Sequence, residues 1–360
     1  MDREAVRHAV GAVAAPRLRR TLDQLELVVS VDATGSGEAR VVTDLPEGVE
    51  SLEQLKRAIA AAARAAGAAD AEVAFRPMDT PAQEALAARL TAGLPTRPGA
   101  PGSRPRVISI ASGKGGVGKS SVTANTAVAL ARAGRDVAVL DANVWGFSIP
   151  RMLGVQEPPA VVGGLIVPAE AHGVRVISMD FFIPPDQAVI WRGPMLHKAL
   201  EQFLDEVFWD EPEFLLLDLP PGTGDVPISL SQFVPGALTV VVTTPQPTAQ
   251  RVARRAALTA VKMEQEVAGV VENMSWFTGD DGRRYEIFGA GGGQALADEL
   301  KVPLLGKIPL VPALREGADR GEPVALAAPD SEVAAAFDAI AARMAALRPR
   351  VRRRSELAIE

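Results

Sequence analysis

The sequence predicts an α/β fold with a doubly wound, mainly parallel sheet, preceded by a smaller α+β domain. Short apolar runs begin at residues 107, 137, 174, 214, 238 and 267, and helical patterns separate them. Runs that are apolar throughout are typical of parallel strands, because helices cover both faces of such a sheet. A stretch rich in Pro and Gly at residues 92–105 sets this region apart from the N-terminal part.

The chain is long enough for two domains, with 360 residues of which 48% are hydrophobic. We expect the small α+β domain at residues 1–91, a semi-extended linker at 92–105, the larger α/β domain at 106–346 and a basic tail at 347–360. Within the first domain, helical patterns cover residues 6–13 and 52–66, and strand-like runs lie at 25–31 and around Val41. Thr80, Pro81 and Gln83 predict the start of one more helix.

Charge and residue content exclude several classes of site. The 38 basic and 44 acidic residues give a net charge of −6, which does not favour a nucleic-acid partner on a broad basic face. The chain has no cysteine, which excludes disulfides, thiolate nucleophiles and thiolate-held zinc or iron–sulfur sites within it. No stretch approaches the roughly 18 apolar residues of a membrane span, and the first residues lack the pattern of a secretory signal. We therefore expect a cytoplasmic protein.

The strand predicted at residues 107–111 leads directly into a phosphate-binding motif. The pattern G-x-x-x-x-G-K-[ST] is matched in full by Gly113, Lys114, Gly115, Gly116, Val117, Gly118, Lys119 and Ser120. The glycines let backbone N–H groups surround phosphate oxygens, Lys119 reaches the terminal phosphates, and the Ser120 hydroxyl ligates Mg²⁺. A helix predicted at residues 121–133, with Ser121 at its start and Gly134 after its end, completes the motif. The sequence thus predicts a P-loop that binds ATP and Mg²⁺.

Two aspartates at the ends of predicted strands are candidates for the metal site. Asp141 ends the run at 137–141, and Asp218 ends the run at 214–218. Ligands of open parallel sheets bind at the carboxyl ends of the strands, so we expect Asp141 and Asp218 to hold Mg²⁺ together with Ser120. The alternative is a solvated loop or a helix cap, which applies more strongly to Asp225.

Several motifs make residues 106–340 resemble the Mrp/ApbC family of P-loop ATPases. They are the second lysine of the P-loop, Lys114, with DLPPGTGD at 218–225, WRGPM at 191–195, ENMS at 272–275, IFG at 287–289, the glycines at 291–293 and residues 306–324. The first 90 residues are similar to the small α+β domain that often precedes this ATPase in bacteria, although the usual Gly-Cys-Pro segment is absent.

The resemblance implies a homodimer with ATP at its interface. Lys114 matches the signature lysine that reaches the partner subunit's nucleotide, which adds Lys114 to Lys119 and Asp141 as expected catalytic residues. Asn273 matches the asparagine that contacts adenine, and the alternative is that its amide ties loop backbone together. Asn143 stands where relatives place a second aspartate near the attacking water. An amide positions water without accepting its proton, so we include Asn143 in the catalytic set and expect slow hydrolysis.

The family is mainly known for carrying iron–sulfur clusters, which it holds with a Cys-x-x-Cys after the ENMS segment. Here that segment continues as WFTGDDGRRY at 276–285, and Asp281 with Gly282 predicts a β-hairpin turn in its place. Asp280 and Asp281 are hard oxygen ligands that suit a cluster poorly. Any cluster would therefore need ligands from a client or assembly partner.

Three functions compete on this reading. The first is an ATP-dependent iron–sulfur cluster carrier or assembly factor. The second is a cysteine-less switch or scaffold similar to MinD and ParA, and the third is an ATPase that energises a partner through the N-terminal domain. No role is assigned to Trp191, Arg192 or the scattered His8, His172 and His197, and the arginine-rich tail is expected to be solvated.

Overall fold

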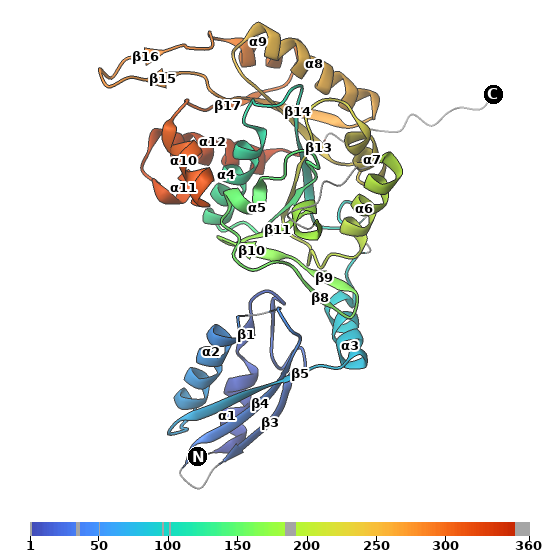
Figure 1. Cartoon of the computed structure of the whole chain (residues 1–360), viewed down its shortest axis with the longest axis vertical. Coiled ribbons are helices and arrows are strands. Elements are labelled where there is room, and N and C mark those ends of the chain that lie inside the picture. Colours follow the sequence, from blue (N-terminus) through green and yellow to red (C-terminus); the bar gives the residue numbers. More distant parts are fainter. Residues whose placement is uncertain are drawn as a thin grey trace, which may run out of the picture. The chain divides into compact units, whose positions relative to one another are not determined.

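The computed structural model describes residues 2–33, 37–49, 51–95, 97–100, 102–183 and 192–349 (Figure 1). Trp191 and most of the basic tail therefore lie outside the described residues. The chain forms two compact units: Met1–Leu94 with Gln156–Glu170 and Asp205–Asp210, and Pro95–Val155 with Ala171–Leu204 and Glu211–Glu360. The sequence-based boundaries place residues 156–170 and 205–210 in the larger domain, whereas their contacts place them in the first unit.

The first unit packs helices on a three-stranded sheet of order β3-β4-β5. β3 and β4 pair antiparallel, and β4 and β5 pair parallel. The returning β8–β9 hairpin contributes Val162 and Val167 to the same core as Leu18 and Ile59, which explains why this segment belongs to the unit. The elements of the first unit are α1 (Arg3–Gly11), β1 (Ala14–Ala15), β2 (Arg20–Thr21), β3 (Val28–Ala33), β4 (Ala39–Leu45), α2 (Leu52–Ala65), β5 (Ala71–Pro77), α3 (Thr80–Thr91), β8 (Ala160–Val162) and β9 (Leu165–Val167).

The predicted start of α3 at Thr80 is confirmed, but the residue that caps it precedes the predicted set. Asp79 is the N-cap, and its carboxylate accepts a hydrogen bond from the backbone N–H of Ala82. Thr80 and Pro81 are the first helical residues, where proline has no N–H that needs a partner.

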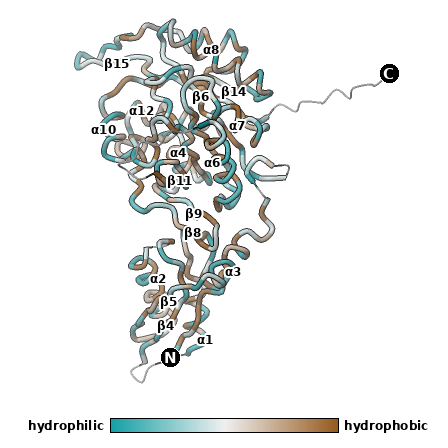
Figure 2. The backbone as a smooth tube through the Cα atoms, turned by 45° about the vertical axis from the view of Figure 1, so that its right-hand side comes forward, coloured by the Kyte–Doolittle hydropathy of each residue, from teal (hydrophilic) through white to brown (hydrophobic). Residues whose placement is uncertain are grey.

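The second unit contains the predicted doubly wound parallel sheet, in the order β10-β11-β7-β12-β6-β13-β14-β17. The strands from β11 to β17 in this order pair in parallel. Hydrophobic residues concentrate on these strands (Figure 2), as burial of both faces requires. The strands are β6 (Arg106–Ser112), β7 (Val137–Asp141), β10 (Ala169–Ala171), β11 (Val174–Ser178), β12 (Phe214–Asp218), β13 (Leu238–Thr243), β14 (Glu266–Glu272) and β17 (Leu304–Lys307).

Helices surround this sheet. They are α4 (Lys119–Arg132), α5 (Ile149–Met152), η1 (Met179–Phe182), α6 (Gly193–Asp205), α7 (Asp225–Phe233), α8 (Pro247–Lys262), α9 (Gly292–Leu300), α10 (Pro312–Arg320), α11 (Val324–Ala327) and α12 (Glu332–Ala346). The helix after the P-loop begins at Lys119, two residues before the predicted start, because Gly118 already acts as its N-cap. Among the described residues, the helices are all too short or too polar to cross a membrane.

A β-hairpin projects from the second unit at the segment that follows ENMS (Figure 1). β15 (Phe277–Thr278) and β16 (Arg284–Tyr285) pair antiparallel, with Phe277 opposite Tyr285. Gly282 has a φ of 73°, and the Tyr285 hydroxyl donates to an Asp281 carboxylate oxygen over 2.8 Å. The predicted hairpin turn is therefore confirmed.

Candidate functional site

The P-loop joins β6, in the middle of the sheet, to α4. Residues from Lys114 to Ser121 line a cavity of about 200 Å³ together with Ser112, Asn143, Ser148, Met152 and Pro221. Gly113 is required by close packing, because a Cβ there would lie 2.1 Å from the carbonyl carbon of Val252 in α8. Gly118 has a φ of 80°, so a side chain at this N-cap would be strained. Local chain geometry thus builds the loop that the motif predicts.

Asp218 is fully buried at the end of β12 and gathers the polar groups of the P-loop helix. One carboxylate oxygen accepts hydrogen bonds from Lys119 Nζ at 2.5 Å and from Ser120 Oγ at 2.7 Å. The other accepts from Thr123 Oγ1 at 2.5 Å. The predicted metal-site residues Asp218 and Ser120 therefore lie in direct contact. Thr123 was not predicted, and its place one turn after Lys119 on α4 is the signal that could have identified it.

Asp141 lies beside Asp218, because β7 and β12 pair with these two residues in register. Its carboxylate accepts from the backbone N–H groups of Asn143, Ser148 and Ile149 over 3.1 to 3.2 Å. Burial raises the pKa of Asp141 to about 7, and the negative charge of Asp218 adds to the shift. Two buried carboxylates with a neighbouring serine hydroxyl form a set of hard oxygen donors that suits Mg²⁺.

Lys114 and Asn143 lie on the rim of the same cavity. Lys114 Nζ donates to the Gln246 side-chain oxygen over 3.3 Å at the N-cap of α8. The Asn143 amide nitrogen donates to the carbonyl of Gly146 over 3.2 Å. Its amide oxygen is buried and accepts from no group within the part of the chain that the structure describes. Asn143 thus keeps an acceptor beside the predicted phosphate site.

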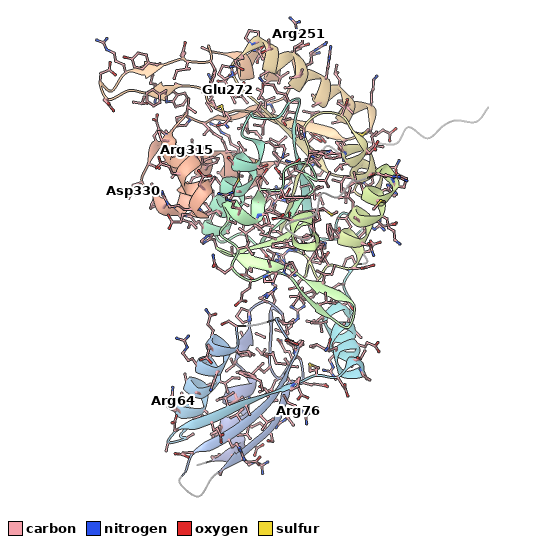
Figure 3. All side chains as sticks on the ribbon, viewed as in Figure 1. Arg64, Arg76, Arg251, Glu272, Arg315 and Asp330 are labelled. Atoms are coloured by element: carbon pink, nitrogen blue, oxygen red, sulfur yellow. The ribbon has the colours of Figure 1, made fainter. Side chains whose placement is uncertain are left out.

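Asn273 is in contact with the P-loop through its amide. Its nitrogen donates to the carbonyl of Val117 over 2.9 Å, and its oxygen accepts from the N–H of Met274. The side chain is buried, so in this structure Asn273 ties loop backbone together, as the alternative interpretation states. Glu272, the preceding residue (Figure 3), accepts from Gly293 N and Ser275 Oγ at 2.5 and 2.9 Å.

Four large apolar side chains are exposed in the segments that follow the carboxyl ends of the central strands. Their exposure was not predicted from the sequence, and they are Trp145, Phe182, Met195 and Ile228. Trp145, which follows β7, is 69% exposed. Exposed apolar groups of this size on one edge of a sheet are typical of a protein–protein contact surface.

Comparison with known proteins identifies the family. The family model of the NUBPL iron-transfer P-loop NTPase, within the ParA group, matches residues 104–345. An iron–sulfur cluster carrier protein of Mycobacterium bovis is 44% identical over 351 residues, which are 94% of this chain and 91% of the relative. A protein of the same name from Bacillus subtilis is 39% identical, covering 85% and 88%. The chain belongs to the iron–sulfur cluster carrier family of P-loop NTPases.

Solved structures agree with this assignment. The nucleotide-binding protein of Archaeoglobus fulgidus in complex with ADP is 35% identical and has a TM-score of 0.53, over 60% of this chain and 86% of that protein. The cell division ATPase MinD of Pyrococcus furiosus is 26% identical with a TM-score of 0.52, over 68% and 99%. The predicted fold and the predicted resemblance are both confirmed.

The hairpin of this iron–sulfur carrier family member lacks the thiolate ligands that an iron–sulfur cluster needs. The chain contains no cysteine, and Asp281 is bonded to Tyr285 and Arg283. Within the described ranges, no group of three or more His, Cys, Asp or Glu side chains is placed to hold a metal ion. The residues present therefore do not fit an iron–sulfur cluster, whereas the P-loop and its two aspartates fit Mg²⁺ and a nucleotide.

Proposed function

We propose that this carrier-family protein binds Mg²⁺–ATP at the P-loop and hydrolyses it slowly. The observation that carries this proposal is the buried contact of Asp218 with Lys119 and Ser120, beside Asp141. Ser120, Asp141 and Asp218 would hold the metal, directly or through its waters, and the metal would neutralise charge on the phosphates. The backbone N–H groups from Gly113 to Ser121 would surround the phosphate oxygens.

Positioning and charge stabilisation dominate phosphoryl transfer, and the remaining residues fit those two tasks. Lys119, which pairs with Asp218 in this structure, would place its ammonium at the terminal phosphates. The free acceptor of Asn143 would orient the attacking water but take up no proton, which would limit the rate. Asn273 contacts Val117 within the loop, and an adenine contact would require its amide to leave that carbonyl.

We further propose that the active form is a homodimer in which Lys114 serves the partner subunit's nucleotide. Two observations support this. Among the residues that the structure describes, Lys114 forms one long hydrogen bond, to Gln246, and exposed apolar side chains such as Trp145 lie on the same edge of the sheet. Burial of those side chains against a second copy would bring two P-loops together. Sedimentation of the protein with and without Mg²⁺–ATP tests this, and a monomer under both conditions contradicts it.

We propose that the protein still takes part in iron–sulfur cluster delivery. The cluster would be a cargo whose thiolate ligands come from a client or assembly protein. The test measures iron and acid-labile sulfide per dimer after anaerobic reconstitution, with and without Mg²⁺–ATP. The matched variant, Thr278→Cys with Asp281→Cys, places a Cys-x-x-Cys in the hairpin.

We expect no cluster on the wild-type protein alone, a cluster when a client with free thiols is added, and a cluster on the variant alone. Cluster on the wild-type protein alone would show ligation without cysteine and overturn the partner-ligand step. If a client fails to acquire cluster in the presence of the protein and Mg²⁺–ATP, the cysteine-less ATP-driven switch becomes the better interpretation. The absence of cysteine is the observation that favours this second function.

A further inference from the structure

The two aspartates of the predicted metal site are held by different kinds of donor. The Asp141 carboxylate accepts from three backbone N–H groups, at residues 143, 148 and 149, besides the Ser178 hydroxyl. Among the residues that the structure describes, the donors to the Asp218 carboxylate are three side chains of α4, and no backbone N–H reaches it. They are Lys119, Ser120 and Thr123. The orientation of Asp218 therefore depends on where these three side chains point.

Two of the three donors to Asp218 also face the nucleotide site. Lys119 and Ser120 line the P-loop cavity, and under the proposed function the ammonium turns to the phosphates and the hydroxyl to Mg²⁺. Thr123 is fully buried and does not line that cavity. Its hydroxyl has one proton, and the Asp218 oxygen at 2.5 Å is a closer acceptor than the Lys119 carbonyl at 3.1 Å. Thr123 is thus the donor that would stay with Asp218 when nucleotide binds.

Loss of the Thr123 hydroxyl would leave one oxygen of a fully buried carboxylate without a donor among the described residues. The last torsion of an aspartate has a broad energy profile, so the carboxylate would turn easily once Lys119 and Ser120 have left it. Mg²⁺ requires nearly ideal octahedral geometry and tolerates such rotation poorly. We propose that Thr123 is a positioning residue, whose hydroxyl holds the Asp218 carboxylate in the orientation that the metal requires. The inference rests on the proposed function of the P-loop.

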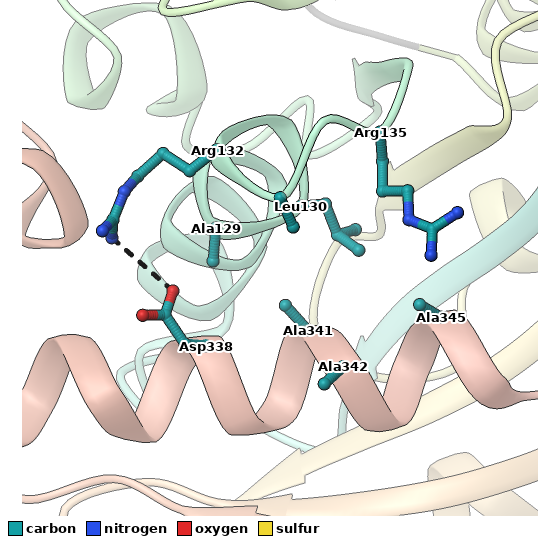
Figure 4. A pocket seen from close by; sticks show the side chains of 9 residues that line it. Ala129, Leu130, Arg132, Arg135, Asp338, Ala341, Ala342 and Ala345 are labelled. Carbon is teal, nitrogen blue, oxygen red and sulfur yellow. Dashed lines mark ion pairs between the residues drawn. The ribbon is translucent and has the colours of Figure 1, made fainter.

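The opposite end of α4 has no comparable link to the metal site. A cavity of about 390 Å³ lies there, between α4 and α12 (Figure 4), and its lining is mostly alanine. Its Arg132 and Arg135 are paired with Asp338 and Glu213, at 3.5 and 3.3 Å. The contacts of α4 with Asp218 therefore come from its first two turns.

Thr126 offers an internal comparison, because it is fully buried on the same helix, three residues after Thr123. Its hydroxyl has no hydrogen-bond partner among the described residues. Replacement of threonine by valine keeps the shape of the side chain and removes the hydroxyl at either position. The bond to Asp218 is therefore what distinguishes the Thr123 variant from the Thr126 variant.

The test measures binding of a fluorescent ADP analogue to the full-length protein, with excess Mg²⁺ and with EDTA, so it does not depend on turnover. Thr123→Val is the test variant, Thr123→Ser keeps the hydroxyl, and Thr126→Val is the matched control. Binding in EDTA shows that each variant is folded with an intact P-loop. Thr123→Ala replaces Thr123→Val if the valine variant does not bind the analogue in EDTA.

We expect Thr123→Val to bind the analogue about tenfold more weakly than the wild-type protein in Mg²⁺, and within about twofold of it in EDTA, because the hydroxyl acts through a metal ligand. Thr123→Ser and Thr126→Val should both bind as the wild-type protein does. Equal affinity of Thr123→Val and the wild-type protein in Mg²⁺ overturns the proposal. An equal loss in Thr126→Val, or a loss that serine does not restore, would indicate a packing effect and also overturn it. If Mg²⁺ does not tighten binding to the wild-type protein, the proposed metal site itself is wrong, and this inference fails with it.

Discussion

Replacement of Asp218 by asparagine removes the charge that holds the P-loop helix groups together while keeping the shape of the side chain. Lys119, only 6% exposed, would lose its carboxylate partner at 2.5 Å. Loss of one partner from a buried ion pair costs about 3–5 kcal/mol, because the other charge stays buried. Part of this cost is offset at Asp141, because the negative charge of Asp218 opposes ionisation of Asp141 and the variant removes that charge. We therefore expect Asp218→Asn to lower the free energy of unfolding by about 3 kcal/mol.

The same change should lower Mg²⁺-dependent ATP turnover by at least about 100-fold, because a preorganised charge at the metal site is lost. Urea unfolding followed by tryptophan fluorescence measures the first effect, and phosphate release measures the second. Asp225→Asn is the matched control, because this exposed carboxylate at the start of α7 should contribute less than about 1 kcal/mol. Turnover that persists in Asp218→Asn would refute the metal-site assignment.

Three further variants test the remaining assignments. Because the pKa of Asp141 rises from 3.8 to about 7, the folded protein keeps a proton that the unfolded chain releases, and stability falls as pH rises from about 4 to about 7. Asp141→Asn should remove roughly 2–4 kcal/mol of this loss, measured by urea unfolding between about pH 5 and pH 8 without Mg²⁺, and an unchanged pH dependence contradicts the shift. Lys114→Ala should lower ATP turnover about 100-fold. The free energy of unfolding should change little, because the bond removed among the described residues is a long one of 3.3 Å to Gln246. Normal turnover would contradict a role of Lys114 at the partner subunit's nucleotide. Asn143→Asp should raise kcat about tenfold by supplying a base, and a fall would contradict water positioning by the amide.

Features that depend on neighbouring residues could be predicted from the sequence. The P-loop follows from one strand, one glycine-rich loop and one helix, all within residues 106–134. The closeness of Asp141 and Asp218 follows from parallel pairing, since each ends an apolar run at the same edge of the sheet. Even here the exact start of α4 was missed, because a glycine in the left-handed region caps the helix without leaving a side-chain signal.

Features that depend on which distant surfaces meet could not be predicted. The bond from Lys114 to Gln246 joins residues 132 positions apart. The apolar pattern of residues 160–167 predicts burial but does not say in which core, and the structure places this hairpin with the first unit. Deletion of residues 1–92 would therefore expose Val162 and Val167, so a domain boundary inferred from composition alone gives an unsuitable truncation.

One short backbone segment, Glu272 and Asn273, links the hairpin region to the nucleotide site. Asn273 is bonded to Val117 in the P-loop, while Glu272, directly before it, is bonded to Gly293 at the start of α9. A phosphate-induced shift of the Val117 carbonyl would act on Asn273 and, through the peptide bond, on Glu272. That connection needs no thiolate. We therefore expect the hairpin of this cysteine-less chain, with its exposed Tyr285 and Ile287, to respond to nucleotide, and unchanged Tyr285 fluorescence on addition of Mg²⁺–ATP would contradict this expectation.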